Sequence, residues 1–392
     1  IPDPDRARQP VAPSDGPSAG RRPTLRPCGN DPHGEGRAPG RDALPESESN
    51  ASRPLRPIGR ILLTPVILAL ATWSALALYF GPFASSGLAS LMAVVGVGAA
   101  GAIAFGRDPR IPLGVFVSAF LLFLFAWSRV EPSNDRPWQL DVARLPHATL
   151  DGDLVTIHDI RDFDYRSETD YTPRYYDKTF DLRELDEVDL ITVYWMGDAI
   201  AHVMVSFGFG GRDYVTISIE TRKELGESYD TIRGFFRQYE LIYVVGDDRD
   251  LIRLRTSYRK NPVEDVYLYR TAISLANARR LFLDYLREIN SLYEKPEFYN
   301  TGTTNCTTNV WRHTKVNPGS HAFSWKILLS GYAAEYVYDR GMLDTSMPFD
   351  ALRKRSHVNA AAQAADGAAD FAQRIRAGLP RPAPHPDPVA PS

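Results

Sequence analysis

Cysteine is almost absent from this chain of 392 residues, which contains only Cys28 and Cys306. Cys28 lies in a polar N-terminal segment, and Cys306 is the only thiol of the globular part. The composition therefore excludes a fold held together by internal disulfides. A lone cysteine outside the cytoplasm is a liability unless the protein uses its thiol, so Cys306 is a candidate functional residue.

An excess of charge of either sign is also absent. The net charge is −3, and the basic residues of the globular part are interspersed with acidic ones. Without a basic stripe, the chain offers no case for a nucleic-acid partner. The sequence predicts no cofactor and no metal site.

Apolar runs are missing from both ends of the chain. Residues 1–57 are rich in Pro, Gly, Arg, Asp and Ser, and such a segment cannot bury enough surface to offset its ordering entropy. We therefore expect a disordered N-terminal tail. Residues 351–392 are Ala-rich and then Pro-rich, which predicts a mobile tail.

Long apolar runs occur only in residues 58–129, where residues 61–83, 88–105 and 111–127 are each apolar. About 20 apolar residues cross a bilayer, so the sequence predicts a three-helix transmembrane anchor. The second run is rich in small residues, and Gly96 and Ala100 suit close helix packing. A cleaved signal peptide fits badly, because the first run is long and far from the N-terminus.

The loops between these runs differ in charge. The loop at residues 81–87 carries no charge. Three arginines precede the first run (Arg53, Arg56 and Arg60), and two lie between the second and third runs (Arg107 and Arg110). The positive-inside rule then places everything after Arg129 outside the cytoplasm. If the Ala/Gly-rich run does not insert, two spans and a cytoplasmic domain result.

The remaining chain divides into a Pro-containing linker at residues 130–149 and a soluble domain at residues 150–350. Alternating or β-branched runs predict strands within residues 153–166, 188–196, 201–209, 214–222, 239–247 and 264–273, the third and fourth forming a hairpin. Residues 274–295 predict an amphipathic helix whose apolar face comprises Leu275, Ala278, Leu281, Phe282, Tyr285, Leu286 and Ile289. This pattern indicates an α+β domain with a mostly antiparallel sheet.

Cys306 follows the Thr/Asn/Gly loop 298–305 and begins a predicted helix. Backbone N–H groups and the helix dipole at such a position favour a thiolate and can hold an oxyanion. The alternative interpretation is a buried cysteine that packs as a small apolar side chain.

A nucleophilic thiol needs a base within hydrogen-bond reach. His313 lies seven residues further along the helix, roughly 10 Å away, and is expected to be a surface or C-terminal-turn residue. His202 begins a predicted strand, and a strand end is a rigid mount for a base. The other histidines of the domain region have weaker contexts: His147, His158, His321 and His357.

An imidazole base is commonly oriented by a third polar group. Glu220 ends the strand that pairs with the His202 strand, and counting back from the hairpin turn brings it near His202. Alternatively, Glu220 belongs to a solvated charge run at residues 220–224. Asp198, four residues before His202, is the other candidate for orienting the ring.

The order His202, Glu220, Cys306 resembles that of circularly permuted papain-like (NlpC-type) thiol enzymes. Residues 201–209, 213–224, 233–245, 265–270 and 298–309 (with NCTTN at 305–309) more closely resemble the periplasmic domain of Lnb-type lipoprotein N-acyltransferases. The resemblance covers about residues 150–345. In that family the domain precedes its membrane helices, whereas here the three predicted helices come before the domain.

This resemblance implies a permuted papain-like domain in the periplasm, anchored in a bacterial inner membrane by several spans. It also implies that Cys306 carries an acyl group as a thioester, with His202 as base and Glu220 as its orienting residue. Membrane phospholipid and lipoprotein or another lipid-linked substrate would be the partners. A cell-wall peptidase or amidase of the same fold, and a non-enzymatic anchored binding module, remain the alternatives.

Overall fold

The computed structural model describes residues 57–385 of the chain. The expectation of a disordered tail at residues 1–57, together with Cys28, Arg53 and Arg56, falls almost wholly outside the described residues. So does the end of the C-terminal tail, from residue 386 onward.

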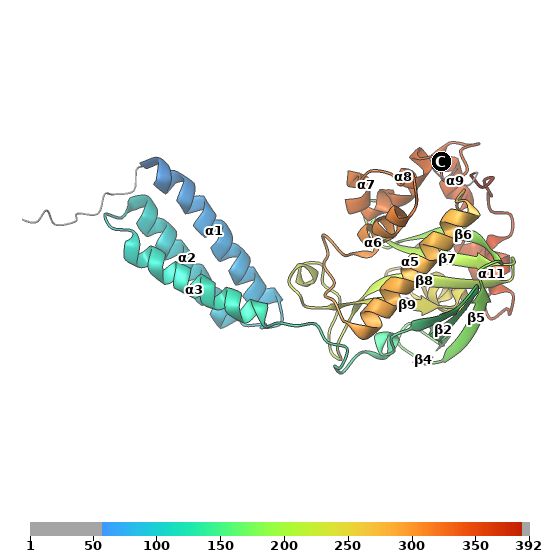
Figure 1. Cartoon of the computed structure of the whole chain (residues 1–392), viewed down its shortest axis with the longest axis horizontal. Helices are drawn as coiled ribbons and strands as arrows, with labels where there is room; N and C mark the ends of the chain where they lie inside the picture. Colours follow the sequence, from blue (N-terminus) through green and yellow to red (C-terminus); the bar gives the residue numbers. More distant parts are fainter. Residues whose placement is uncertain (1–56, 386–392) are drawn as a thin grey trace, which may run out of the picture. The chain divides into compact units, whose positions relative to one another are not determined.

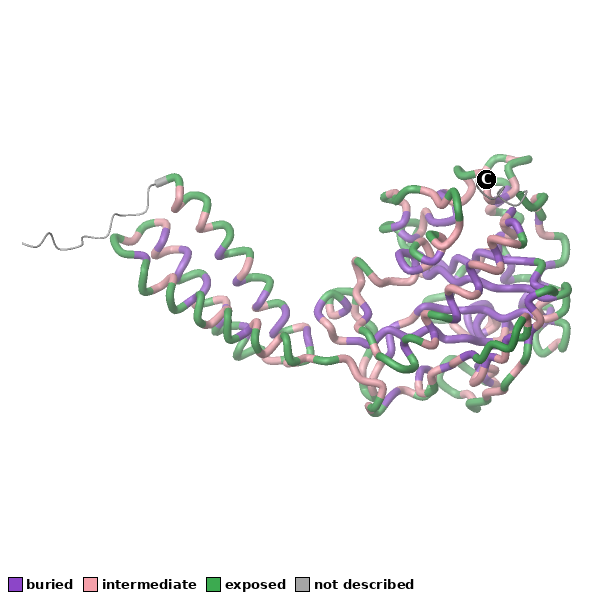
Figure 2. Tube along the Cα trace, in the orientation of Figure 1, coloured by how far each residue is buried: buried purple, intermediate pink, exposed green. Residues whose placement is uncertain are grey.

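Three apolar helices lead the described chain: α1 (Pro57–Phe80), α2 (Ser86–Phe105) and α3 (Arg110–Ser128). Each is long and apolar enough to cross a membrane, including the Ala/Gly-rich α2. Gly96 of α2 packs directly on Ala71 of α1, so close that an added Cβ would clash with the Ala71 side chain. The small residues therefore serve close helix packing, as the sequence predicts. Much of the outer helix surface is exposed and apolar (Figure 2).

The soluble domain is built on one eight-stranded sheet with the order β1-β2-β9-β8-β7-β6-β10, and β5 also pairs with β2. Its strands are β1 (His147–Asp151), β2 (Leu154–Arg161), β5 (Tyr175–Asp181), β6 (Leu185–Tyr194), β7 (Ala201–Phe209), β8 (Asp213–Arg222), β9 (Glu240–Gly246) and β10 (Asp265–Arg270). The short β3 (Asp164–Tyr165) and β4 (Tyr171–Thr172) form a separate pair. Only β2 and β9 pair in parallel, so the α+β class and the mostly antiparallel sheet are confirmed.

Helices cover both faces of this sheet (Figure 1). One face packs against α5 (Leu275–Glu294), through contacts such as Phe207 with Phe282 and Tyr285. The buried side of α5 is the predicted one except at Leu275, which is the first residue of the helix and is exposed. The opposite face packs against α4 (Asp248–Arg253), α10 (Asn359–Ala364) and α11 (Phe371–Arg376).

One end of the sheet collects the elements that matter for the site. β6 ends and β7 begins there, because Tyr194 pairs with Ala201, and β8 ends opposite the start of β9, because Arg222 pairs with Glu240. The remaining helices are α6 (Cys306–His313), α7 (Trp325–Leu328), α8 (Ala333–Asp339) and α9 (Phe349–Arg355). Of these, α6 packs against β7 and β8.

The C-terminal segment differs from the expected mobile tail, since residues 349–376 contribute three helices to the fold. Arg376 is buried, with ion pairs to Asp189 at 2.7 Å and Asp248 at 2.5 Å, and Phe371 is fully buried. The Ala-rich composition that suggests a tail instead allows these short helices to lie close to the sheet.

The expected linker at residues 130–149 is also largely part of the domain. Trp138 forms a bridge with Glu224, and residues 147–151 form strand β1. Its prolines separate short stretches that are individually bonded to the sheet, so the domain begins before residue 150.

Candidate active site

Cys306 is the first residue of α6, as the sequence predicts. The helix is capped by Asn305, whose side-chain oxygen accepts the N–H of Thr308 at 2.8 Å. Such a side chain is a preferred helix cap because it satisfies one of the free N–H groups of the first turn. The thiol therefore sits at the positive end of a helix dipole.

The loop before Cys306 is held by its own polar side chains. The Asn300 carboxamide oxygen accepts the N–H groups of Gly302 and Thr303, at 2.9 and 3.1 Å. The Thr304 hydroxyl in turn accepts the N–H of Asn300 at 2.7 Å. These local bonds explain the Thr/Asn/Gly composition of the loop, since such residues bond to nearby backbone and favour tight turns.

His202 is the second residue of β7, and its side chain is largely buried. Its Nε2 lies 2.7 Å from Ser218 Oγ and 3.1 Å from Glu220 Oε1. Ser218 donates its own proton to Glu220 at 2.7 Å. Its oxygen must then accept from His202, so Nε2 carries a proton.

The sulfur of Cys306 lies near the end of the β7–β8 pairing. The paired residues of β7 and β8 run only as far as Met204 and Ser218, so Val203 lies beyond the ladder. The Val203 N–H and His202 both favour the thiolate form of Cys306 and lower its pKa. Thr307 Oγ1 lies 3.7 Å from the sulfur.

The ionisation of the three groups follows from these contacts. Burial raises the pKa of the Cys306 thiol, but the hydrogen bond and charge of His202 outweigh it and lower the pKa below its ordinary value. Burial opposes protonation of His202, yet the Glu220 carboxylate raises its pKa to about 9. Burial likewise opposes ionisation of Glu220, but its bond to charged His202 holds its pKa well below the ordinary range. The arrangement favours a thiolate beside an imidazolium.

Arg255 is a member of this cluster that sequence reasoning missed. It lies on a π-helical turn at Leu254–Tyr258 and is 3.1 Å from Glu220 and 3.3 Å from Glu264. Strand alternation alone puts Ser218 on the same face of β8 as Glu220, but it gives Ser218 no role. No pattern around residue 255 singles out Arg255, because only the fold brings it to the strand end.

The structure does not bring the other candidates to the thiol. Asp198 is exposed and pairs with Arg353 at 2.7 Å. His313 ends α6 but is buried rather than at the surface, with Tyr243 at 2.8 Å and Asp284 at 2.9 Å as partners. Two further histidines contact other groups: His158 bonds Asp177 and His357 bonds Asp265.

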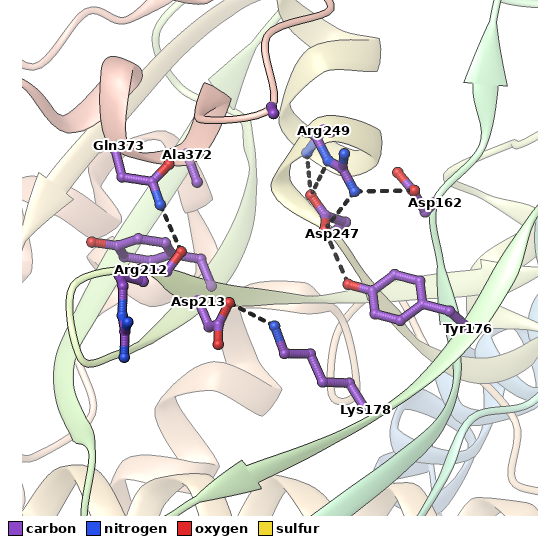
Figure 3. Close-up of a pocket in the computed structure, with 11 residues that line it drawn as sticks. Asp162, Tyr176, Lys178, Arg212, Asp213, Asp247, Arg249, Ala372 and Gln373 are labelled. Carbon is purple, nitrogen blue, oxygen red and sulfur yellow. Dashed lines mark hydrogen bonds and ion pairs between the residues drawn. The ribbon is translucent and has the colours of Figure 1, made fainter.

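A separate pocket of about 430 Å³ lies near the turn between β7 and β8, at the other end of these strands from His202 (Figure 3). Its charges largely neutralise one another: Lys178 pairs with Asp213 at 2.6 Å and Arg249 with Asp247 at 3.2 Å. It therefore offers no local excess of charge to a ligand. Within residues 57–385, no group of three or more His, Cys, Asp or Glu side chains is arranged to hold a metal ion.

Comparison with known proteins bears on the stretch that carries the thiol. No curated protein and no solved structure matches the chain. Residues 171–331 match the family model described as Lnb N-terminal periplasmic domain, and this range includes His202, Glu220 and Cys306. The chain thus joins three helices that could cross a membrane to a segment that matches the Lnb N-terminal periplasmic domain, as the sequence resemblance predicts.

Proposed function

We propose that this protein is a membrane-anchored, cysteine-dependent acyltransferase that works through an acyl-thioester on Cys306. The observation that carries the proposal is the position of Cys306 at the start of α6 beside His202, which lowers the pKa of the thiol and whose Nε2 is held 3.1 Å from Glu220. A nucleophile, a base and a residue that orients the base are the components that acyl transfer requires.

In the first half-reaction, the Cys306 thiolate attacks the ester carbonyl of a membrane phospholipid. The C–S bond forms, the C–O ester bond breaks, and the His202 imidazolium gives its proton to the leaving alkoxide of the lysolipid. The developing oxyanion is held by free N–H groups at the start of α6. The lowered pKa of the thiol favours this thiolate, and His202 is the base that holds its proton.

In the second half-reaction, an amine of a lipoprotein or another lipid-linked acceptor attacks the thioester. The C–N bond forms, the C–S bond breaks, and His202 takes the proton released by the amine. This step restores the ion pair. Glu220 orients the ring throughout and stabilises its charged form, without itself transferring a proton.

We further propose that the chain is a multi-pass protein of a bacterial inner membrane, with the thiol in the periplasm. Arg60 lies in the first turn of α1, Arg107 lies between α2 and α3, and Arg110 begins α3, whereas the α1–α2 loop is uncharged. This distribution supports a cytoplasmic location for the basic loop.

The test uses full-length protein in vesicles of phosphatidylethanolamine and phosphatidylglycerol. The peptide that contains Cys306 should gain the mass of a fatty acyl chain, and neutral hydroxylamine should remove it. Cys28→Ser, which replaces the other thiol, should leave this adduct intact, and Cys306→Ser should lose the thioester. Cleavage of peptidoglycan fragments without acyl mass would favour an amidase. If folded, membrane-inserted protein shows neither acylation nor cleavage, the result would favour a non-enzymatic binding module.

A further inference from the structure

The loop that joins β8 to β9, residues 223–239, exposes several large apolar side chains. They are Leu225, Tyr229, Ile232 and Phe235, with 65%, 49%, 49% and 47% of their surfaces exposed. Single exposed apolar residues need no explanation, but four within eleven residues form a patch of the kind that marks an interaction site.

This loop is held by the segment that leaves the third apolar helix. The Ser133 N–H bonds the Glu240 carboxylate at 3.2 Å, and Arg136 pairs with Glu224 at 2.8 Å. Trp138, ten residues after Ser128, bridges directly to Glu224. Ten residues span at most about 35 Å even when fully extended. Both ends of the loop must therefore stay close to the membrane.

Two residues of the loop also contact the ends of the apolar helices. Phe236 stacks on Phe80, the last residue of α1, with ring centroids 6.4 Å apart. Arg237 donates to the Trp127 carbonyl oxygen at 3.0 Å and lies over its indole ring. Trp residues at helix ends commonly mark the membrane–water interface. The exposed apolar residues thus belong to a loop fixed at that level.

The same loop is bonded to the chain that leads to the thiol. The Thr301 N–H donates to the Gly234 carbonyl at 3.1 Å, and the Thr301 hydroxyl donates to the Thr231 carbonyl at 2.8 Å. Gly234 leaves no room for a side chain, because an added Cβ would collide with the Thr301 hydroxyl. Thr301 lies five residues before Cys306.

We propose that the 223–239 loop docks on the bilayer that holds the chain's own helices, inserting Leu225, Tyr229, Ile232 and Phe235 among the lipid headgroups and upper acyl chains. Burial of apolar side chains at this level stabilises membrane contact. Its consequence, which rests on the proposed function, is that a lipid ester reaches Cys306 directly from the bilayer.

The docking is tested with full-length protein carrying Cys28→Ser and Cys306→Ser, so that a single new cysteine can be labelled. Ile232→Cys takes the fluorophore NBD, and Leu275→Cys is the matched control. Leu275 is 53% exposed and follows the far end of β10. Both samples are reconstituted in phosphatidylethanolamine and phosphatidylglycerol vesicles with and without brominated lipid.

We expect the probe at residue 232 to be blue-shifted and strongly quenched by brominated lipid, and the probe at residue 275 to show neither effect. Equal behaviour of the two probes would overturn the proposal. A blue shift at residue 232 without lipid quenching would also overturn it, since protein, such as a second copy of the chain, would then cover the loop.

A second experiment measures the consequence for acylation. Leu225→Asp combined with Ile232→Asp should slow formation of the Cys306 thioester about tenfold, because two apolar anchors are lost. Leu275→Asp should leave the rate unchanged. Iodoacetamide labelling of Cys306 should be equal in all three proteins, which shows that the site is intact.

The two proposals fail in distinguishable ways. If wild-type protein forms no thioester, the proposed function is wrong, while the NBD probe still decides whether the loop docks. If the thioester forms at the same rate in the double variant, the loop does not deliver the donor.

Discussion

At the scale of single residues, the reactivity of Cys306 depends on two opposing influences. Burial raises the pKa of its thiol, and the hydrogen bond with His202 lowers it. His202 can act in this way because Glu220 raises the pKa of the ring to about 9, so the ring stays charged up to about that pH. The pair is therefore ionised between the depressed pKa of the thiol and the raised pKa of the ring.

The first prediction concerns this pH range. Iodoacetamide should label wild-type Cys306 rapidly below pH 7, whereas a free thiol ionises near pH 8.5. In His202→Ala, the largest influence that lowers the thiol pKa is lost, so labelling should require a higher pH than in the wild type, near the free-thiol value of about 8.5. Acyl transfer should fall above the His202 pKa of about 9, where the proton donor is lost. Wild-type labelling that rises only near the free-thiol pKa would contradict the ion pair.

Glu220 supports a second prediction. Glu220→Gln keeps the size of the side chain but loses its charge, so the pKa of His202 should fall and the upper limb of the pH profile should move down. We expect acyl transfer to drop roughly 10- to 100-fold, the loss typical when a residue that orients a metal-bound histidine is replaced. His202→Ala and Cys306→Ala should lose more.

Asp198→Asn is the comparison for this variant, because Asp198 pairs with Arg353 away from the ring. It should keep the wild-type profile. If Asp198→Asn is impaired while Glu220→Gln behaves like wild type, Asp198 is the orienting residue.

At the scale of elements, the sequence predicts the helices and strands whose apolar residues repeat with a regular spacing. β7, β8 and α5 are found correctly because their apolar residues alternate or follow a helical stripe that one sheet face buries. This periodicity also places Glu220 near His202. β5 was missed, because its sequence YYDKTFD is largely polar and only Phe180 is fully buried.

Non-local contacts account for what the sequence could not reveal. Arg255 reaches Glu220 from a π-helical turn 35 residues later, and the pairing of Arg376 with Asp189 spans 187 residues. Such contacts leave no local pattern. For the same reason, α9 to α11 are not distinguishable in sequence from an Ala-rich tail.

The attachment of α11 gives a third prediction. Arg376→Met removes the cation shared by the buried carboxylates of Asp189 and Asp248, of which Asp189 keeps only the longer pair with Arg270 at 3.5 Å, and should destabilise the protein by about 3–5 kcal/mol. Arg374→Met, two residues earlier, removes an exposed pair with Asp370 and should cost about 0–1 kcal/mol. Thermal unfolding of the detergent-purified variants measures the difference. Equal losses would mean that α11 is not held by its buried arginine.

At the scale of the whole molecule, the fourth prediction concerns topology. Alkaline phosphatase fused behind residue 385 should be active, because the enzyme requires an oxidising compartment to form its disulfides. A green fluorescent protein fused at the same position should be dark. The reverse result would place the thiol in the cytoplasm and indicate that only two of the three apolar helices span the membrane.

The short connection between Ser128 and Trp138 has a kinetic consequence. A thiol that cannot leave its membrane encounters donors by lateral diffusion, so its rate should follow the mole fraction of donor in the surface. Diluting a vesicle suspension with buffer should leave the acylation rate per protein unchanged. Replacing donor lipid with an ether lipid, which has no ester to transfer, should lower the rate in proportion. Mixing protein-bearing vesicles with separate donor vesicles should give no acylation, whereas a rate that tracks bulk donor concentration would mean that the thiol takes its acyl group from solution.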